Sequence, residues 1–134
     1  MESTQDLGVE FYDILGKLFY AVAASDGIVS ASEIKSLERM VRSHWICMEE
    51  VTDLFSNCLP KQIVQCFERA RFKKLDVYEC LEEFKYFKLE NPQLFMPDVN
   101  KLIWSTANVI AHCYPGFNES EAVVLTKLQE VLED

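Results

Sequence analysis

Hydrophobic residues recur every three or four positions along most of the chain, and glycine, proline or helix-capping residues separate the repeats. This spacing places apolar side chains on one face of an amphipathic helix. No useful length of the chain alternates between apolar and polar residues as a half-buried strand does, so we expect an all-α fold without a sheet. The pattern predicts seven helices and one short helical turn: Asp6–Ala24, Ala31–His44, Met48–Cys58, Pro60–Arg71, Leu75–Leu89, the turn Pro92–Met96, Pro97–Ala111 and Glu119–Leu132.

The helix that begins at Pro97 is apolar on most of its circumference. A helix that is hydrophobic all round is usually buried on all sides. We therefore expect it to be the central helix of a single-domain bundle that spans residues 1–134.

The clearest signals for a helix end and a helix start lie between the first two predicted helices, in the sequence from Ser25 to Glu33. Gly27 is the residue best suited to the left-handed conformation that ends a helix. Ser30 and Glu33 have the spacing of a capping box, in which the serine hydroxyl and the glutamate carboxylate each accept a backbone N–H at the start of a helix. The two helices are expected to form an antiparallel hairpin, with Ile28 and Val29 filling its closed end.

A second copy of this pattern lies near the C-terminus. Alignment of Glu33 with Glu121 places Ser30 on Asn118, which is another strong N-cap. Asp26 falls on Tyr114 in this alignment, so the copy is imperfect. The repeat predicts two similar helical hairpins packed near each other.

The string A-A-x-D-G-x-V-x-x-x-E from Ala23 to Glu33, with its later copy, resembles the TerB-like domain family of tellurite-resistance and stress-response proteins. The resemblance covers roughly Phe11–Val41 and Trp104–Leu132. It implies an all-helical fold of two pseudo-repeated hairpins. It also implies that paired acidic turns hold a metal ion, which here would involve Asp26, Glu33 and Glu121.

An acidic metal site can also be weighed from the residues themselves. A self-contained calcium loop is excluded, because Val22 and Ala24 would occupy ligand positions when Glu33 is set as the twelfth position. A site shared between the two turns would collect carboxylates for a divalent cation such as calcium, magnesium, manganese or zinc; the candidate ligands are Asp26, Glu33, Glu121 and Glu119. The alternative, which we favour, is that these side chains only satisfy turn amides and helix starts.

The chain of 134 residues is 49% hydrophobic and has a formal net charge of −9. This charge weighs against nucleic-acid binding, which needs a contiguous cationic surface. One cationic cluster stands out: Arg69, Arg71, Lys73 and Lys74, with Phe72 among them. We favour the interpretation that these cations compensate a helix C-terminus over the alternative of a patch for an anionic partner or a membrane surface.

The five cysteines form no C-x-x-C pair, which favours reduced cysteines and a cytoplasmic location. No apolar run approaches the ~20 residues of a membrane span, so membrane contact is expected only peripherally, through a partner. Exposed aromatic residues could form a surface for a protein partner or for self-association. The candidates are Phe84, Tyr86 and Phe87, and the alternative is that they belong to the core.

No catalytic triad, phosphate-binding glycine loop or zinc-ligand spacing is present, and no catalytic residue is assigned. The sequence predicts a cytoplasmic, non-enzymatic, TerB-like helical module that binds a partner, with a divalent cation at its acidic turns as the less favoured option. The alternative is a small metal-dependent enzyme that uses the shared acidic pocket.

Overall fold

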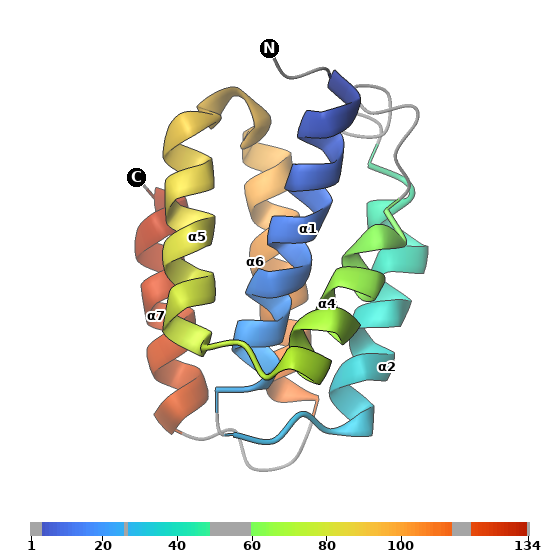
Figure 1. The fold of residues 1–134 in the computed structure, drawn as a ribbon, viewed down its shortest axis with the longest axis vertical. Helices are drawn as coiled ribbons and strands as arrows, with labels where there is room; N and C mark the ends of the chain where they lie inside the picture. The colour runs from blue at the N-terminus through green and yellow to red at the C-terminus, as the bar shows by residue number, and fades with distance from the viewer. Residues whose placement is uncertain (1–3, 26, 49–59, 114–118, 134) are drawn as a thin grey trace.

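The computed structural model describes residues 4–25, 27–48, 60–113 and 119–133, and these residues form a helical bundle (Figure 1). The predicted all-α class is confirmed, because the described part of the chain contains no strand. From residue 49 onward the predicted helix Met48–Cys58 lies outside the described residues. The elements are α1 (Thr4–Ala23), α2 (Ala31–Met40), a π-helical turn η1 (Val41–Trp45), α4 (Gln62–Lys73), α5 (Val77–Glu90), a 3₁₀ turn η2 (Pro92–Leu94), α6 (Pro97–His112) and α7 (Glu119–Glu133).

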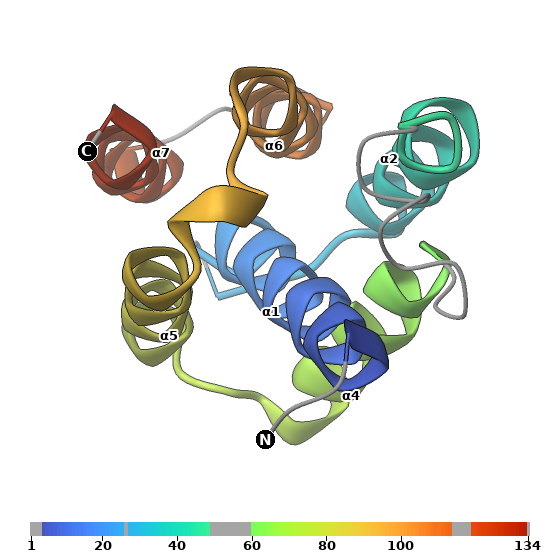
Figure 2. The same cartoon turned by 90° about the horizontal axis from the view of Figure 1, so that it is seen from above.

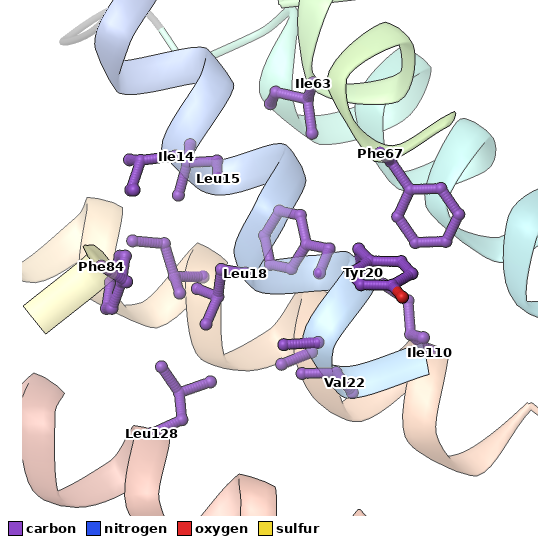
Figure 3. Close-up of a cluster of buried hydrophobic side chains, with 14 of the residues drawn as sticks. Ile14, Leu15, Leu18, Tyr20, Val22, Ile63, Phe67, Phe84, Ile110 and Leu128 are labelled. Atoms are coloured by element: carbon purple, nitrogen blue, oxygen red, sulfur yellow. The ribbon is translucent and has the colours of Figure 1, made fainter. Parts of the chain in front are cut away.

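Helix α1 is the central element, as the view from above shows (Figure 2). It packs against α4, α5, α6 and α7. Leu15 and Leu18 of α1 point into a cluster that also contains Phe84 of α5 and Leu128 of α7, all of them fully buried (Figure 3). The prediction that α6 is central is therefore wrong. The additional apolar residues of α6 lie on its flanks, where Val109 is 37% exposed.

Gly16 explains the close approach of α1 and α4. A Cβ atom at Gly16 would lie 2.6 Å from the Cβ of Cys66 and 2.6 Å from the carbonyl oxygen of Ile63. Only a residue without a side chain allows the two helices to contact at this distance. The missing Cβ thus sets the spacing of this helix pair.

The expected antiparallel hairpin of α1 and α2 is not what the structure shows. Helix α2 packs chiefly against α6 rather than against α1. Trp45, at the end of η1, is buried and donates its indole N–H to the hydroxyl of Thr106 on α6, at 3.1 Å. This hydrogen bond attaches the end of η1 to α6.

The closed end of the predicted hairpin is also different from the expectation. Ile28 is 73% exposed, and only Val29 packs partly against the core. At the other end of the chain, α6 and α7 do contact each other. The two helix pairs therefore differ in how they pack.

Within the described ranges, no helix is both long and apolar enough to cross a membrane.

Candidate functional site

The capping box at the start of α2 is confirmed. The backbone N–H of Ser30 donates to Oε1 of Glu33 at 2.7 Å, and the backbone N–H of Glu33 donates to the hydroxyl of Ser30 at 3.1 Å. Gly27 has a φ of 91°, so it adopts the predicted left-handed conformation before this helix. Glu33 is only 4% exposed, and one of its carboxylate oxygens is occupied by the helix start.

The structure describes three of the four carboxylates proposed as metal ligands. Glu121 lies in the first turn of α7 and is 5% exposed, whereas Glu119 is exposed. Asp26 lies outside the described residues. Among the residues that the structure does describe, no three His, Cys, Asp or Glu side chains are grouped closely enough to hold a metal ion. Glu33, Glu119 and Glu121 therefore do not form such a group, and the cation site stays a prediction.

The aromatic candidates on α5 divide into core and surface. Phe84 is fully buried, and its ring lies edge-on to Phe95 with centroids 5.7 Å apart, so its assignment to a partner surface is wrong. Phe87 is partly buried and its ring lies 6.4 Å from that of Phe11. Tyr86 is 61% exposed and remains a surface residue. The helical period explains the split, because Phe84 lies on the face of α5 that meets α1.

The C-terminal end of α4 presents cations around one exposed aromatic ring. Phe72 is 88% exposed, the highest value of any large hydrophobic side chain in the described residues. Arg71 and Lys73 lie in the last turn of α4 and Lys74 directly follows it, as the sequence predicted, while Arg69 lies earlier in the helix. We call this group the cationic tip; its members are Arg69, Arg71, Phe72, Lys73 and Lys74.

Ion pairs neutralise part of the cationic tip. Arg71 donates to Oε2 of Glu68 from two nitrogens, at 2.8 and 3.1 Å, and Arg69 lies 3.6 Å from a carboxylate oxygen of Asp13. Within the described part of the chain, Lys73 and Lys74 form no salt bridge. These two lysines therefore carry the charge that an incoming anionic group can use.

Lys74 has an unusual backbone conformation. It caps α4 in the left-handed region, with φ 54° and ψ 51°. Glycine is the usual residue at this position, because a Cβ atom is disfavoured there. The position holds a lysine whose side chain lines two adjoining hollows at this end of the molecule.

The larger hollow is an open groove of about 760 Å³ at the end of the bundle where α1 ends and α5 begins. Figure 1 shows the connection between α4 and α5 crossing this end beside the last turn of α1. We call it the end groove. Its described lining residues come from the end of α1 and the turn after it, the α4–α5 connection and α7: Tyr20, Ala24, Ser25, Gly27, Ile28, Val29, Arg71, Lys74, Leu75, Asp76, Val77, Tyr78 and Val124.

Two hydrogen bonds fix the position of residues that line the end groove. The hydroxyl of Tyr20 donates to the carbonyl oxygen of Leu75 at 2.9 Å, which ties the α4–α5 connection to α1. Burial, with smaller contributions from Cys80 and Asp76, raises the pKa of Tyr20, so this phenol keeps its proton at neutral pH. Asp76 accepts the backbone N–H of Glu79 at 3.0 Å and thereby fixes the start of α5.

Exposed apolar side chains from three separate segments meet at this end. Ile28 is 73% exposed and Tyr78 is 54% exposed, and both line the end groove beside the cationic tip with its exposed Phe72. A concave surface of this volume that combines apolar walls with a few charged groups is typical of a binding site. Of its described titratable lining residues, Tyr20 and Asp76 are engaged in hydrogen bonds of the fold.

The sequence indicated the cations and Phe72 but not the groove. The cluster was visible as a run of basic residues, and we interpreted it as compensation of a helix end. Ile28 and Tyr78 are distant from this run in the sequence, so their presence beside it depends on the tertiary fold. The predicted helix ends at Arg71 and Leu75 already place Lys74 between two helices, but they do not show which distant segments face it.

Comparison of the chain with protein-family models, with curated proteins and with solved structures finds no match.

Proposed function

We propose that this protein is a non-enzymatic helical binding module, and that the end groove and the cationic tip form its binding surface. The observation that carries the proposal is the exposure of Ile28 and Tyr78 in a 760 Å³ groove, next to a second hollow with the exposed Phe72. Lys73 and Lys74 lie at the same place and form no salt bridge among the described residues. Large exposed apolar residues cost solvation free energy unless a partner covers them. Aromatic and cationic side chains are also the residue types that contribute most to protein interfaces.

The same proposal includes the family relationship. We propose a TerB-like protein that works in the cytoplasm in a stress response. The capping box of Ser30 and Glu33 supports the relationship, and so does the burial of Glu33 and Glu121 at the same position in the first turns of α2 and α7. Free cysteines in the described residues support a reducing compartment. A divalent cation at the turns stays a prediction of the resemblance alone.

The experiment compares capture of binding partners from a lysate of the native organism by three forms of the protein. The parent should retain a specific partner, and the double variant Lys73→Glu, Lys74→Glu should lose it while its far-ultraviolet circular dichroism is unchanged. The matched control is Lys35→Glu, because Lys35 is an exposed cation that lines a different hollow, between α2 and α6. Equal capture by the parent and the double variant would rule out this binding surface.

A further inference from the structure

We propose that the end groove binds an acidic segment of a partner protein, with an apolar residue of that segment inserted between the groove walls and its carboxylates placed on the cationic tip. This inference rests on the proposed function and deepens it by naming the chemistry of the partner. Its basis is that the end groove has apolar walls and is lined by Lys74, while Lys73 lies in the adjoining hollow; neither lysine has an acidic partner within the described residues.

Charge complementarity selects an acidic occupant. The molecule carries a net charge of −9, so most of its surface repels an acidic segment. Lys73 and Lys74 form a local exception, and the flanking arginines reinforce it although each is already paired. Lys35 and Arg39, between α2 and α6, are a second exposed cationic pair, but the groove beside Lys74 combines its charge with the exposed apolar side chains of Ile28 and Tyr78. An acidic segment that carries an apolar residue is therefore favoured at this end.

The concave shape of the end groove favours a protein segment that carries an apolar side chain. Tyr20 and Val124 are almost completely buried at 6% and 1% exposure, and they form the deep part of the groove. Ile28 and Tyr78 stand more exposed at its rim. An aliphatic or aromatic side chain entering from solvent would cover the rim residues and remove its own surface from water.

An anionic membrane is the less favoured occupant. Membrane recognition by charge usually requires four to eight clustered cations, whereas the two arginines of the cationic tip are paired with Glu68 and Asp13. A membrane surface also does not enter a concave groove. Nucleic acid is disfavoured in the same way, because its binding needs a longer cationic surface than two lysines provide.

Replacement of Lys74 by glycine can test binding without disturbing the fold. Its left-handed backbone conformation suits glycine better than lysine, so the lysine contributes nothing to the helix end that glycine would not provide. Lys74→Gly therefore removes a cation from the rim of the groove while it preserves the fold. We expect this variant to melt at the same temperature as the parent or at a higher one.

The test is a selection of peptides on the full-length protein from a displayed library of random 12-residue sequences. Selected peptides should contain several aspartate or glutamate residues around one aliphatic or aromatic residue. Synthetic versions should bind the parent at least tenfold more tightly than they bind Lys74→Gly, and binding should weaken as salt is raised from 50 to 300 mM. The control variant Lys35→Ala should bind like the parent.

Other outcomes would contradict the acidic partner, its placement in the end groove or the proposed function, as follows. Peptides without acidic residues that still require Lys74 would overturn this inference and leave the proposed function standing. Acidic peptides that bind Lys74→Gly as well as they bind the parent would overturn the placement in the end groove. Failure to select any peptide, together with Lys74-dependent cosedimentation with phosphatidylserine vesicles, would replace the protein partner by a membrane. Failure of both peptides and vesicles would count against the proposed function itself.

Discussion

At the scale of the residue, the absence or the burial of single side chains determines how closely the helices pack. Gly16 has no Cβ atom, and α4 occupies the space that a Cβ atom would need. Cys66, which lies at that contact, is buried, and its thiol donates to the carbonyl oxygen of Asp13 at 3.0 Å. Both residues therefore act as parts of the α1–α4 interface.

Gly16→Ala should destabilise the protein although alanine favours helix formation more than glycine does. The new Cβ would lie within 2.9 Å of the backbone nitrogen of Phe67 and closer still to Cys66 and Ile63, so α4 must move. We expect a loss of about 2 kcal/mol in the free energy of unfolding, measured by urea denaturation. Gly27→Ala is the contrast: it has open space but a φ of 91°, and should cost about 1 kcal/mol through the backbone alone. A stabilised Gly16→Ala would show that the helices are not in close contact there.

The buried cysteines should be nearly inert toward thiol reagents. Burial raises the pKa of the Cys66 thiol to about 11, and nearby Asp13 adds to the effect; burial also raises the pKa of Cys80 to about 11, with Glu83 contributing. At pH 8 the thiolate fraction of each is then about a hundredfold below that of a thiol with a pKa of 9. Iodoacetamide labelling followed by mass spectrometry should modify the exposed Cys47 before the buried Cys66 and Cys80. Labelling of Cys66 at the rate of Cys47 would contradict this placement.

The same pKa shifts predict how stability depends on pH. The folded state holds the proton of Cys66 and Cys80 more tightly than the unfolded chain does, so their contribution is complete below pH 9. It is lost as the pH rises toward 11. Unfolding experiments at pH 8 and pH 10.5 should therefore show a decrease in stability that is smaller in the Cys66→Ala, Cys80→Ala variant.

At the scale of the element, a buried hydrogen bond helps to attach the end of η1 to the bundle. The hydroxyl of Thr106 accepts the indole N–H of Trp45 and donates to the carbonyl oxygen of Leu102 at 2.7 Å. The Trp45 ring also lies 6.2 Å from the ring of Phe19 on α1. The π-helical geometry of η1 ends at this tryptophan, so the irregular turn and the anchor coincide.

Thr106→Val should separate the hydrogen bond from packing, because valine has nearly the same shape as threonine. It leaves the buried indole N–H without its acceptor, which should cost about 1–3 kcal/mol of unfolding free energy. Thr106→Ser keeps the hydroxyl and should cost less, since only a methyl group is lost. Urea unfolding followed by the fluorescence of Trp45, in a Trp104→Phe background, measures both. Equal losses in the two variants would show that the hydrogen bond contributes little.

The end of α4 gives a second prediction at this scale. Replacement of Lys74 by glycine should leave the unfolding free energy unchanged or raise it by up to about 1 kcal/mol, because the left-handed position no longer carries a Cβ atom. Lys73→Gly, within the helix, should instead lose about 1 kcal/mol. A destabilised Lys74→Gly would show that the lysine side chain contributes to the fold.

At the scale of the whole molecule, local structure could be predicted from the sequence better than packing. The capping box of Ser30 and Glu33 and the left-handed Gly27 depend on neighbouring residues and are confirmed. Six of the seven predicted helices have counterparts in the described residues, with ends that differ by a few positions. Helix α5 begins at Val77 and not at Leu75, because Asp76 caps it. The central position of α1 and the docking of α2 on α6 depend on contacts such as that of Trp45 with a residue 61 positions away.

The candidate site likewise combines features that depend on neighbouring residues with features that depend on the tertiary fold. The cations at the end of α4 are a local feature and are visible in the sequence. The end groove requires Ile28, Tyr78 and Val124 to meet from three segments, which no local pattern encodes. The surface role assigned to Phe84 failed for the same reason, since burial depends on which face of α5 meets α1.

The most direct test of the account is photo-crosslinking inside the native cell, with a benzoylphenylalanine placed at one of two exposed aromatic positions. Phe72 and Tyr86 are 88% and 61% exposed, so both probes can reach a partner, but only Phe72 belongs to the cationic tip. The account predicts a discrete crosslinked protein from position 72 that disappears when Lys73 and Lys74 are replaced by glutamate, and none from position 86. A crosslink from position 86 without one from position 72 would place the partner on the face of α1 and α5 and would contradict the account.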